Sequence, residues 1–398
     1  MDSSTKKQKR KLTPAKMMLI ASGLLIVFAV IQYFVLDLAG AEARQDLRMS
    51  DTEIGISYGF DMQVSFYSPG GRHFFFAARD GVQNISSTGE LRWQHGFTMS
   101  QPDMVGRGGM VAVGERGERQ VYVFGPAGLL YIADFPHPLL YFSINGSGYL
   151  SVILRTDAGY ELRVFSPGNP HQDRAYIYRA PINDANVFPF TVDVSACGTY
   201  IVKGFVDVNT LMTSRVTFSY IRRVDSRGMP DGLFASYNFR DELILRARFT
   251  DSQRVIVLTD HQIIGFDVGK GTQGPLWSIP LHNMPDKFDI GETHFAFVTG
   301  SQFLNRPEAE SAGIVHIYDF NGNLTGSYDL GRRATHLSMG LGAVLAGTDR
   351  TFYAINTQGT RLWSYSAIQD VQDMIFLDNT DTILLAGGAR ATVMRRLR

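Results

Sequence analysis

A short turn that contains glycine and leads into an aromatic side chain recurs along most of this chain. In two clear copies, Gly89 precedes Trp93 and Gly359 precedes Trp363. Turns that we take as equivalent stand at Gly89, Gly128, Gly168, Gly228, Gly271, Gly322 and Gly359. Their spacings of 39, 40, 60, 43, 51 and 37 residues lie close to the roughly 40 to 50 residues of a β-propeller blade. This repeat predicts a propeller.

Each repeat contains four candidate β-strands. One pair flanks the glycine turn, with Val121–Phe124 as an example of the strand before it. A second pair lies upstream around its own turn, for example Leu140–Ile144 and Leu150–Leu154. Beyond residue 50, short runs of β-branched and aromatic residues bounded by Gly, Asn, Asp or Pro recur, which is typical of strands. We therefore expect an all-β fold over residues 51–398.

The repeats also predict how the ring closes. Seven units cover about residues 62–366, and an incomplete unit follows in Val371–Leu377, Thr382–Ala386 and Thr392–Leu397. This last unit lacks one strand. The segment Glu53–Tyr58 would supply it, so that neither end blade keeps an open edge. We expect eight blades, with seven as the alternative.

The first 50 residues have a different composition. Residues 1–16 carry six basic side chains against one acidic side chain, whereas residues 17–36 form an uncharged run of 20 residues. A helix of that length spans the roughly 30 Å hydrocarbon core of a bilayer. The positive-inside rule then predicts a basic cytoplasmic tail at 1–16, a transmembrane helix at 17–36, a stalk at 37–50 and an extracytoplasmic propeller at 51–398.

Two other topologies are compatible with this N-terminus. Ala39, Ala41 and Ala43 offer weak cleavage sites for a signal peptide, although the apolar run is longer than the core of most signal peptides. A cytoplasmic propeller would place the basic cluster outside, against the positive-inside rule. We therefore expect the apolar segment to be retained as a membrane anchor, so that the protein interacts with the membrane through this single span.

Composition argues against several classes of function. The whole chain has a net charge of zero, so the part beyond the basic tail is net acidic, which argues against nucleic-acid binding. The one cysteine, Cys197, provides neither an intramolecular disulfide nor a cysteine-based zinc site. The nine histidines occur without the paired spacing of metal ligands. We predict no metal, no cofactor and no nucleic-acid partner.

Segments that look like ligand-binding loops fail on spacing. Gly265–Gly271 lacks both the four-residue gap and the Ser or Thr of a phosphate loop. Asp319–Asn323 begins like a calcium loop but has no downstream acid. No Gly-x-Ser-x-Gly motif occurs, while a Ser/His/Asp set assembled from distant loops stays open. We predict no catalytic residue.

Two blades contain segments that exceed the repeat. In the fourth blade they are residues 207–215 and 222–232, and in the sixth they are residues 302–311. Long loops on a rigid scaffold are common binding sites. The candidate partner-binding residues are Arg222, Arg223, Gln302, Phe303, Leu304 and Arg306.

Aromatic residues after the glycine turns are candidates for packing one blade onto the next. They are Trp93, Tyr131, Trp277, Tyr328 and Trp363. The Gly-x-x-x-Trp turns that end at Trp93 and Trp363 resemble the repeat ends of quinoprotein-like propellers, and the resemblance implies this packing role. Quinone-dependent dehydrogenases of that fold carry two adjacent cysteines, which this chain lacks.

The order of basic tail, single span and blades is similar to an uncharacterised bacterial family of single-span propeller proteins, with Ser143–Ile153 and Val192–Tyr200 as matching segments. We expect a membrane-anchored, extracytoplasmic scaffold without catalysis that binds a protein or another component of the cell envelope. The alternative is an enzyme or small-ligand sensor with its site in the central channel. Converging inner-strand carboxylates would favour that alternative, and a channel filled by apolar side chains would argue against it.

Overall fold

The computed structural model describes residues 54–58, 64–167, 176–209, 212–221, 232–251, 253–270, 274–299, 313–368 and 370–396. By its contacts the chain divides into Met1–Asp46 and Leu47–Arg398, and all described residues belong to the second unit. The predicted tail, span and stalk lie outside the described residues. Within the described ranges, no helix has the length and apolar character needed to cross a membrane.

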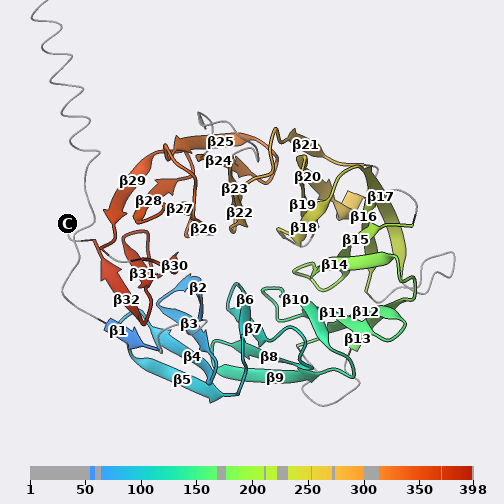
Figure 1. Ribbon diagram of the computed structural model, residues 1–398, viewed down its shortest axis with the longest axis horizontal. Helices are drawn as coiled ribbons and strands as arrows, with labels where there is room; N and C mark the ends of the chain where they lie inside the picture. Colours follow the sequence, from blue (N-terminus) through green and yellow to red (C-terminus); the bar gives the residue numbers. More distant parts are fainter. Residues whose placement is uncertain are drawn as a thin grey trace, which may run out of the picture. The chain divides into compact units, whose positions relative to one another are not determined.

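The described residues form eight antiparallel sheets of four strands each, arranged as the blades of a ring (Figure 1). Blade 1 contains β2 (Ser65–Gly71), β3 (His73–Ala78), β4 (Gly81–Ser86) and β5 (Leu91–Gly96). Blade 2 contains β6 (Asp103–Arg107), β7 (Met110–Gly114), β8 (Gln120–Gly125) and β9 (Gly128–Asp134). Blade 3 contains β10 (Leu139–Ile144), β11 (Leu150–Thr156), β12 (Gly159–Phe165) and β13 (Tyr176–Ile182). Blade 4 contains β14 (Val187–Val194), β15 (Tyr200–Asp207), β16 (Thr213–Tyr220) and β17 (Leu233–Arg240).

The second half of the ring continues the pattern. Blade 5 contains β18 (Ile244–Phe249), β19 (Arg254–Thr259), β20 (Gln262–Asp267) and β21 (Trp277–Pro280), with a short 3-10 helix, η1 (Val268–Lys270), after β20. Blade 6 contains β22 (Lys287–Ile290), β23 (His294–Val298), β24 (Ile314–Asp319) and β25 (Leu324–Asp329). Blade 7 contains β26 (His336–Gly340), β27 (Ala343–Thr348), β28 (Thr351–Asn356) and β29 (Arg361–Ser366). Blade 8 contains β30 (Asp373–Phe376), β31 (Thr382–Ala386), β32 (Arg390–Arg395) and β1 (Ile54–Ser57).

The ring closes through its first strand, which confirms the prediction made for Glu53–Tyr58. Strand β1 pairs antiparallel with β32, from Ile54 opposite Val393 to Ser57 opposite Arg390 (Figure 1). The following residue, Tyr58, donates its backbone N–H to Ala389 at 2.9 Å. The alternative of seven blades is therefore wrong, because residues from both ends of the domain complete an eighth sheet.

Blade-on-blade packing explains why the middle strands read as continuous apolar runs. Every residue of β27 is buried. Val344 packs in the core between blades 6 and 7, whereas its neighbour Leu345 packs in the core between blades 7 and 8. Strands buried on both faces lose the apolar and polar alternation of a strand with one solvent face. The outermost strands, such as β5, regain that alternation.

The glycine turns join the third and fourth strands of their blades where they are described. Gly89 and Gly359 have φ values of +87° and +81°, a region that favours glycine. A Cβ atom on Gly359 would lie 2.5 Å from the carbonyl oxygen of Ser327 in the preceding blade.

The expected loop at 207–215 is shorter than predicted, because Asp207 ends β15 and Thr213 already begins β16. The extra length of blade 4 therefore lies partly in its eight-residue strands. Gly168, Gly228 and Gly271 lie outside the described residues.

Candidate functional site: the central channel

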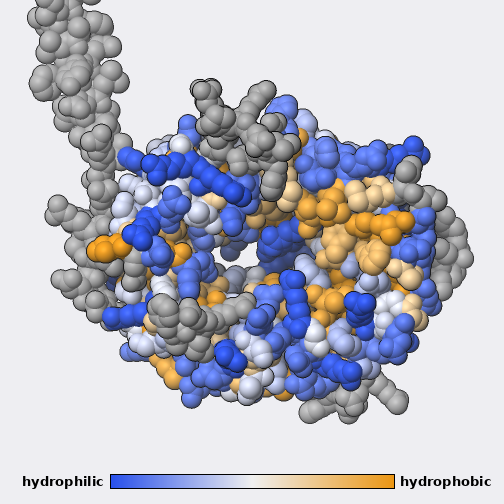
Figure 2. Space-filling model, in the orientation of Figure 1, coloured by the Kyte–Doolittle hydropathy of each residue, from blue (hydrophilic) through white to orange (hydrophobic). Residues whose placement is uncertain are grey.

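The innermost strands of all eight blades surround a cavity of about 790 Å³. Figure 2 shows its opening at the centre of the ring, with hydrophilic residues around the opening. Pockets that bind small molecules have volumes of roughly 300 to 1,000 Å³. The channel is therefore large enough to hold a small ligand.

Both charged and apolar side chains line this channel. The charged residues are Asp103, Arg107, Arg116, Asp193, Arg246, Arg248, Asp289 and Glu292. Blades 7 and 8 contribute apolar residues, among them Met339, Leu341 and Phe376. Apolar side chains therefore do not fill the channel, and carboxylates from more than one inner strand face it. This was the arrangement expected of the small-ligand alternative.

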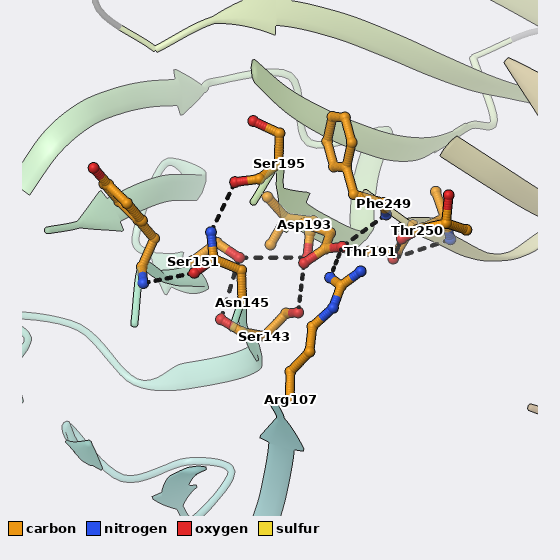
Figure 3. A network of polar contacts seen from close by, with 12 residues as sticks. Arg107, Ser143, Asn145, Ser151, Thr191, Asp193, Ser195, Phe249 and Thr250 are labelled. Atoms are coloured by element: carbon orange, nitrogen blue, oxygen red, sulfur yellow. Dashed lines mark hydrogen bonds and ion pairs between the residues drawn. The ribbon is translucent and has the colours of Figure 1, made fainter. Parts of the chain in front are cut away.

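Asp193 of β14 connects four consecutive blades (Figure 3). It accepts hydrogen bonds from Arg107 Nη1 at 3.0 Å, from Ser143 Oγ at 2.9 Å and from the backbone N–H of Phe249 at 2.8 Å. These donors belong to β6, β10 and β18. The side chain is only 2% exposed. A carboxylate with three donors, one of them a guanidinium, is held in one position, so Asp193 orients the inner strands.

Neighbouring polar groups extend this network between blades 3 and 4. Asn145 donates through Nδ2 to the carbonyl oxygen of Ser195 at 2.8 Å, and its Oδ1 accepts the N–H groups of Ser147 and Tyr149. Figure 3 shows Asn145 between Ser143 and Ser195. The Asn145 side chain thus closes the turn between β10 and β11 and fastens it to the next blade.

Arg246 and Arg248 stand two residues apart on β18, so their side chains lie on the same face of the strand. Both line the channel. Neither guanidinium makes a hydrogen bond or an ion pair with another described residue. Burial lowers the pKa of Arg248 to about 10, with smaller contributions from the like charges of Arg107 and Arg246. Arg248 is still protonated at neutral pH, so the channel contains positive charge without a direct partner among the described residues.

Two tyrosines face the same group of charges. Burial raises the pKa of both Tyr67 and Tyr141 above the ordinary value of a phenol, and the nearby positive charge of Arg248 lowers both only in part. Both hydroxyls are therefore protonated at neutral pH. The Tyr67 hydroxyl donates to the carbonyl oxygen of Gly108 at 2.9 Å.

The three tryptophans lie on outermost strands and reach the next blade. Trp93 donates its indole N–H to the carbonyl oxygen of Pro126 at 3.0 Å, and its ring stacks on Phe124. Trp277 donates to the carbonyl oxygen of Phe320 at 3.2 Å. Each indole thus combines a ring contact with a hydrogen bond across the blade boundary, which is how a partly buried tryptophan satisfies its donor.

The remaining packing candidates make contacts of the same kind. Trp363 donates to the carbonyl oxygen of Thr380 at 2.7 Å. Tyr131 donates its hydroxyl to the carbonyl oxygen of Gly148 at 3.0 Å. The ring of Tyr328 lies 5.6 Å from that of Tyr353 in the next blade, measured between centroids. All five aromatic candidates therefore contact the blade that follows their own.

The loop candidates are not brought together by these findings. Arg222, Arg223, Gln302, Phe303, Leu304 and Arg306 lie outside the described residues. In the described ranges, no group of three or more His, Cys, Asp or Glu side chains is arranged to hold a metal ion. The calcium-like segment at Asp319 forms a turn in which Asp319 Oδ1 accepts the N–H groups of Asn321 and Asn323.

Sequence reasoning did not identify Arg107, Asp193, Arg246 and Arg248 as site residues. A signal was available, because charged residues interrupt otherwise apolar inner strands, as in Val192-Asp193-Val194 and Leu245-Arg246-Ala247-Arg248-Phe249. In a blade, the inner strand is the one whose polar residues reach the axis.

The fold and the lined channel define the class: this protein is an eight-bladed β-propeller with an open, charged centre. The chain belongs to DUF5711, a family of unknown function that matches residues 51–395. No curated protein matches its sequence.

Solved structures are similar to this chain at low sequence identity. BamB from Moraxella catarrhalis is similar with a TM-score of 0.51 and 12% identity, over 88% of this chain and 99% of that one. The β-propeller domain of Cps50 (Swd1) from Myceliophteria thermophila has a TM-score of 0.48 and 12% identity, over 86% of this chain and 98% of that one. At such identity the likeness to BamB concerns the fold alone.

Proposed function

We propose that this protein is a membrane-anchored, extracytoplasmic propeller that binds a protein partner of the cell envelope and does not catalyse a reaction. The uncharged run at 17–36 behind a basic tail supports the anchor and its orientation. Anchoring raises the local concentration of the propeller near the bilayer, so that a modest contact surface is sufficient for binding.

The observation that carries this proposal is an exposed apolar row on the outermost strand of blade 2. In β9, Leu129, Leu130 and Ile132 are 39%, 40% and 40% exposed. Leu91 of β5 on blade 1 is also exposed, and Trp93 joins the two blades at this rim. An outermost strand has a free edge of backbone donors and acceptors. Exposed apolar residues beside such an edge favour an added strand or an apolar partner surface.

Capture by the full chain tests this proposal. Membranes that contain the wild type, the variant L130K/I132K or the control L324K are crosslinked, and the captured proteins are compared. Leu324 is a matched control, because it is 55% exposed on β25, the outermost strand of blade 6. We expect L130K/I132K to lose a partner that the wild type and L324K retain. Identical captured sets for all three would contradict the assignment of β9. Deletion of residues 302–311 tests the predicted loop contact in the same assay.

The only cysteine of the chain tests the topology. Cys197 is exposed and lies in the turn between β14 and β15. In spheroplasts, a membrane-impermeant maleimide should label the wild type and leave the variant C197S unlabelled. Labelling that requires lysis would place the propeller on the cytoplasmic side and would overturn the proposed orientation.

A second candidate function is the binding of a small ligand in the central channel. The specific observation in its favour is that the channel is open and charged, with a volume of about 790 Å³. The rim on β9 and the channel are separate surfaces, so the two functions are compatible in one molecule.

A further inference from the structure

We propose that Arg246 and Arg248 bind an oxyanion, either a phosphate or a carboxylate group, of a small ligand in the central channel. This inference deepens the second candidate function and is independent of the scaffold role. It assigns the chemistry of the ligand and the strand that recognises it, which is β18.

Two part-buried cations lie in the channel wall without a direct partner among the described residues. Arg246 and Arg248 line the channel on one face of β18. No described residue forms a hydrogen bond or an ion pair with either guanidinium. Removing a charge from water without supplying a partner is costly. Two such groups side by side, with Arg107 on β6 facing the same space, are stabilised when an anion enters.

The shape of the guanidinium donors also suits an oxyanion. A guanidinium presents its N–H groups in a planar fork that matches the two oxygens of a carboxylate or a phosphate. The hydroxyl of Tyr141, which also lines the channel, is protonated and adds a donor near this group, whereas the Tyr67 hydroxyl already donates to Gly108. The cavity has room for a ligand as well as its hydration.

The carboxylates of the channel define the rest of the ligand. Asp193 is occupied by three donors, and Asp289 accepts the backbone N–H of Met339 at 2.8 Å. Asp289 and Glu292 nevertheless face the same cavity from blade 6, next to the blade that holds the arginines. They favour hydrogen-bond donors over further negative charge on the rest of the ligand. The ligand class is therefore a small molecule with one oxyanion group and hydrogen-bond donors, such as hydroxyl or amino groups, on its other side.

Titration calorimetry on the full chain in detergent tests the site. The probes are inorganic phosphate and propionate, added separately to a low-salt Tris buffer that contains no other phosphate or carboxylate. The proteins are the wild type, R246Q/R248Q, R248K and the control R119Q, because Arg119 is exposed and outside the channel.

We expect at least one probe to bind to the wild type and to R119Q with the same affinity. Binding should be lost in R246Q/R248Q, and it should weaken about tenfold in R248K, equivalent to one lost hydrogen bond of the fork. Binding of phosphate alone or of propionate alone identifies which oxyanion the site prefers. No binding of either probe to the wild type, or equal binding to R246Q/R248Q, would overturn the proposal.

The melting temperature without probe separates this role from a structural one. Because the two arginines have no described partner and repel each other, R246Q/R248Q should melt at the same temperature as the wild type or higher. A lower melting temperature would show that the arginines stabilise the ring itself, which contradicts a site kept for a ligand. Capture of a partner through β9 is a separate readout, so failure here leaves the scaffold proposal testable.

Discussion

Replacement of Trp363 by alanine should destabilise the ring more than any comparable change at the other blade boundaries. Trp363 is 1% exposed in the core between blades 7 and 8. Its indole N–H donates to the carbonyl oxygen of Thr380, and its ring lies edge-on to Phe376. Deleting a fully buried tryptophan side chain costs about 4 kcal/mol, since a cavity remains.

Two further variants divide this cost into its parts. W363F keeps most of the buried ring and leaves the Thr380 carbonyl without its donor, so it should cost about 1.5 kcal/mol. Trp93 makes the same kind of contact between blades 1 and 2, but it is only partly buried. W93A should therefore cost about half as much as W363A, or about 2 kcal/mol.

Far-UV circular dichroism in urea measures these differences without depending on tryptophan fluorescence. The expected order of unfolding midpoints is wild type, then W363F, then W93A, then W363A. If W363A unfolds at the same urea concentration as W93A, burial at the blade boundary does not determine the cost, and the reasoning fails.

Other consequences concern charge. Burial lowers the pKa of His316 below its ordinary value of 6.5; the unfolded chain then binds more protons, so the free energy of unfolding should fall as pH drops from 7 to 5. H316Q should make this pH dependence shallower; equal slopes for H316Q and the wild type in urea titrations would contradict this. R107M should cost about 3 kcal/mol, because it removes one donor from the buried Asp193. R116M, which breaks an exposed pair, should cost under about 1 kcal/mol by the same assay.

The sequence contains enough local information to predict the ring. Glycine turns with positive φ, such as those at Gly89 and Gly359, require a residue type that is visible in the sequence. Runs buried on both faces, such as β27, are visible as continuous apolar segments. The missing strand of the last repeat identified β1 as its partner, because a closed propeller leaves no end blade with an open edge.

The channel could not be predicted in the same way, because its contacts join distant parts of the chain. Asp193 meets Arg107 across 86 residues and Phe249 across 56 residues. The spacing of these residues along the chain does not indicate their contacts, because the contacts depend on how neighbouring blades are arranged. The segments 207–215, 222–232 and 302–311 were selected as loops because they exceed the repeat. Because Thr213 already begins β16, part of this extra length belongs to a strand and not to a loop.

The closure of the ring by β1 is tested most directly by a disulfide across β1 and β32. Ser57 and Arg390 are exposed register partners. The bond from Tyr58 N to Ala389 O at 2.9 Å places them at a position without paired hydrogen bonds, where opposing Cα atoms lie about 4.5 Å apart and suit a disulfide.

The measurement is mass spectrometry of the oxidised variant S57C/R390C, made in a C197S background. The control is S57C/R395C, because Arg395 is exposed on the same strand but lies five residues, or about 17 Å, from the position opposite Ser57. We expect an intramolecular disulfide in S57C/R390C and free thiols in S57C/R395C. Free thiols in S57C/R390C, or equal crosslinking of both variants, would contradict an eight-bladed ring closed by its first strand.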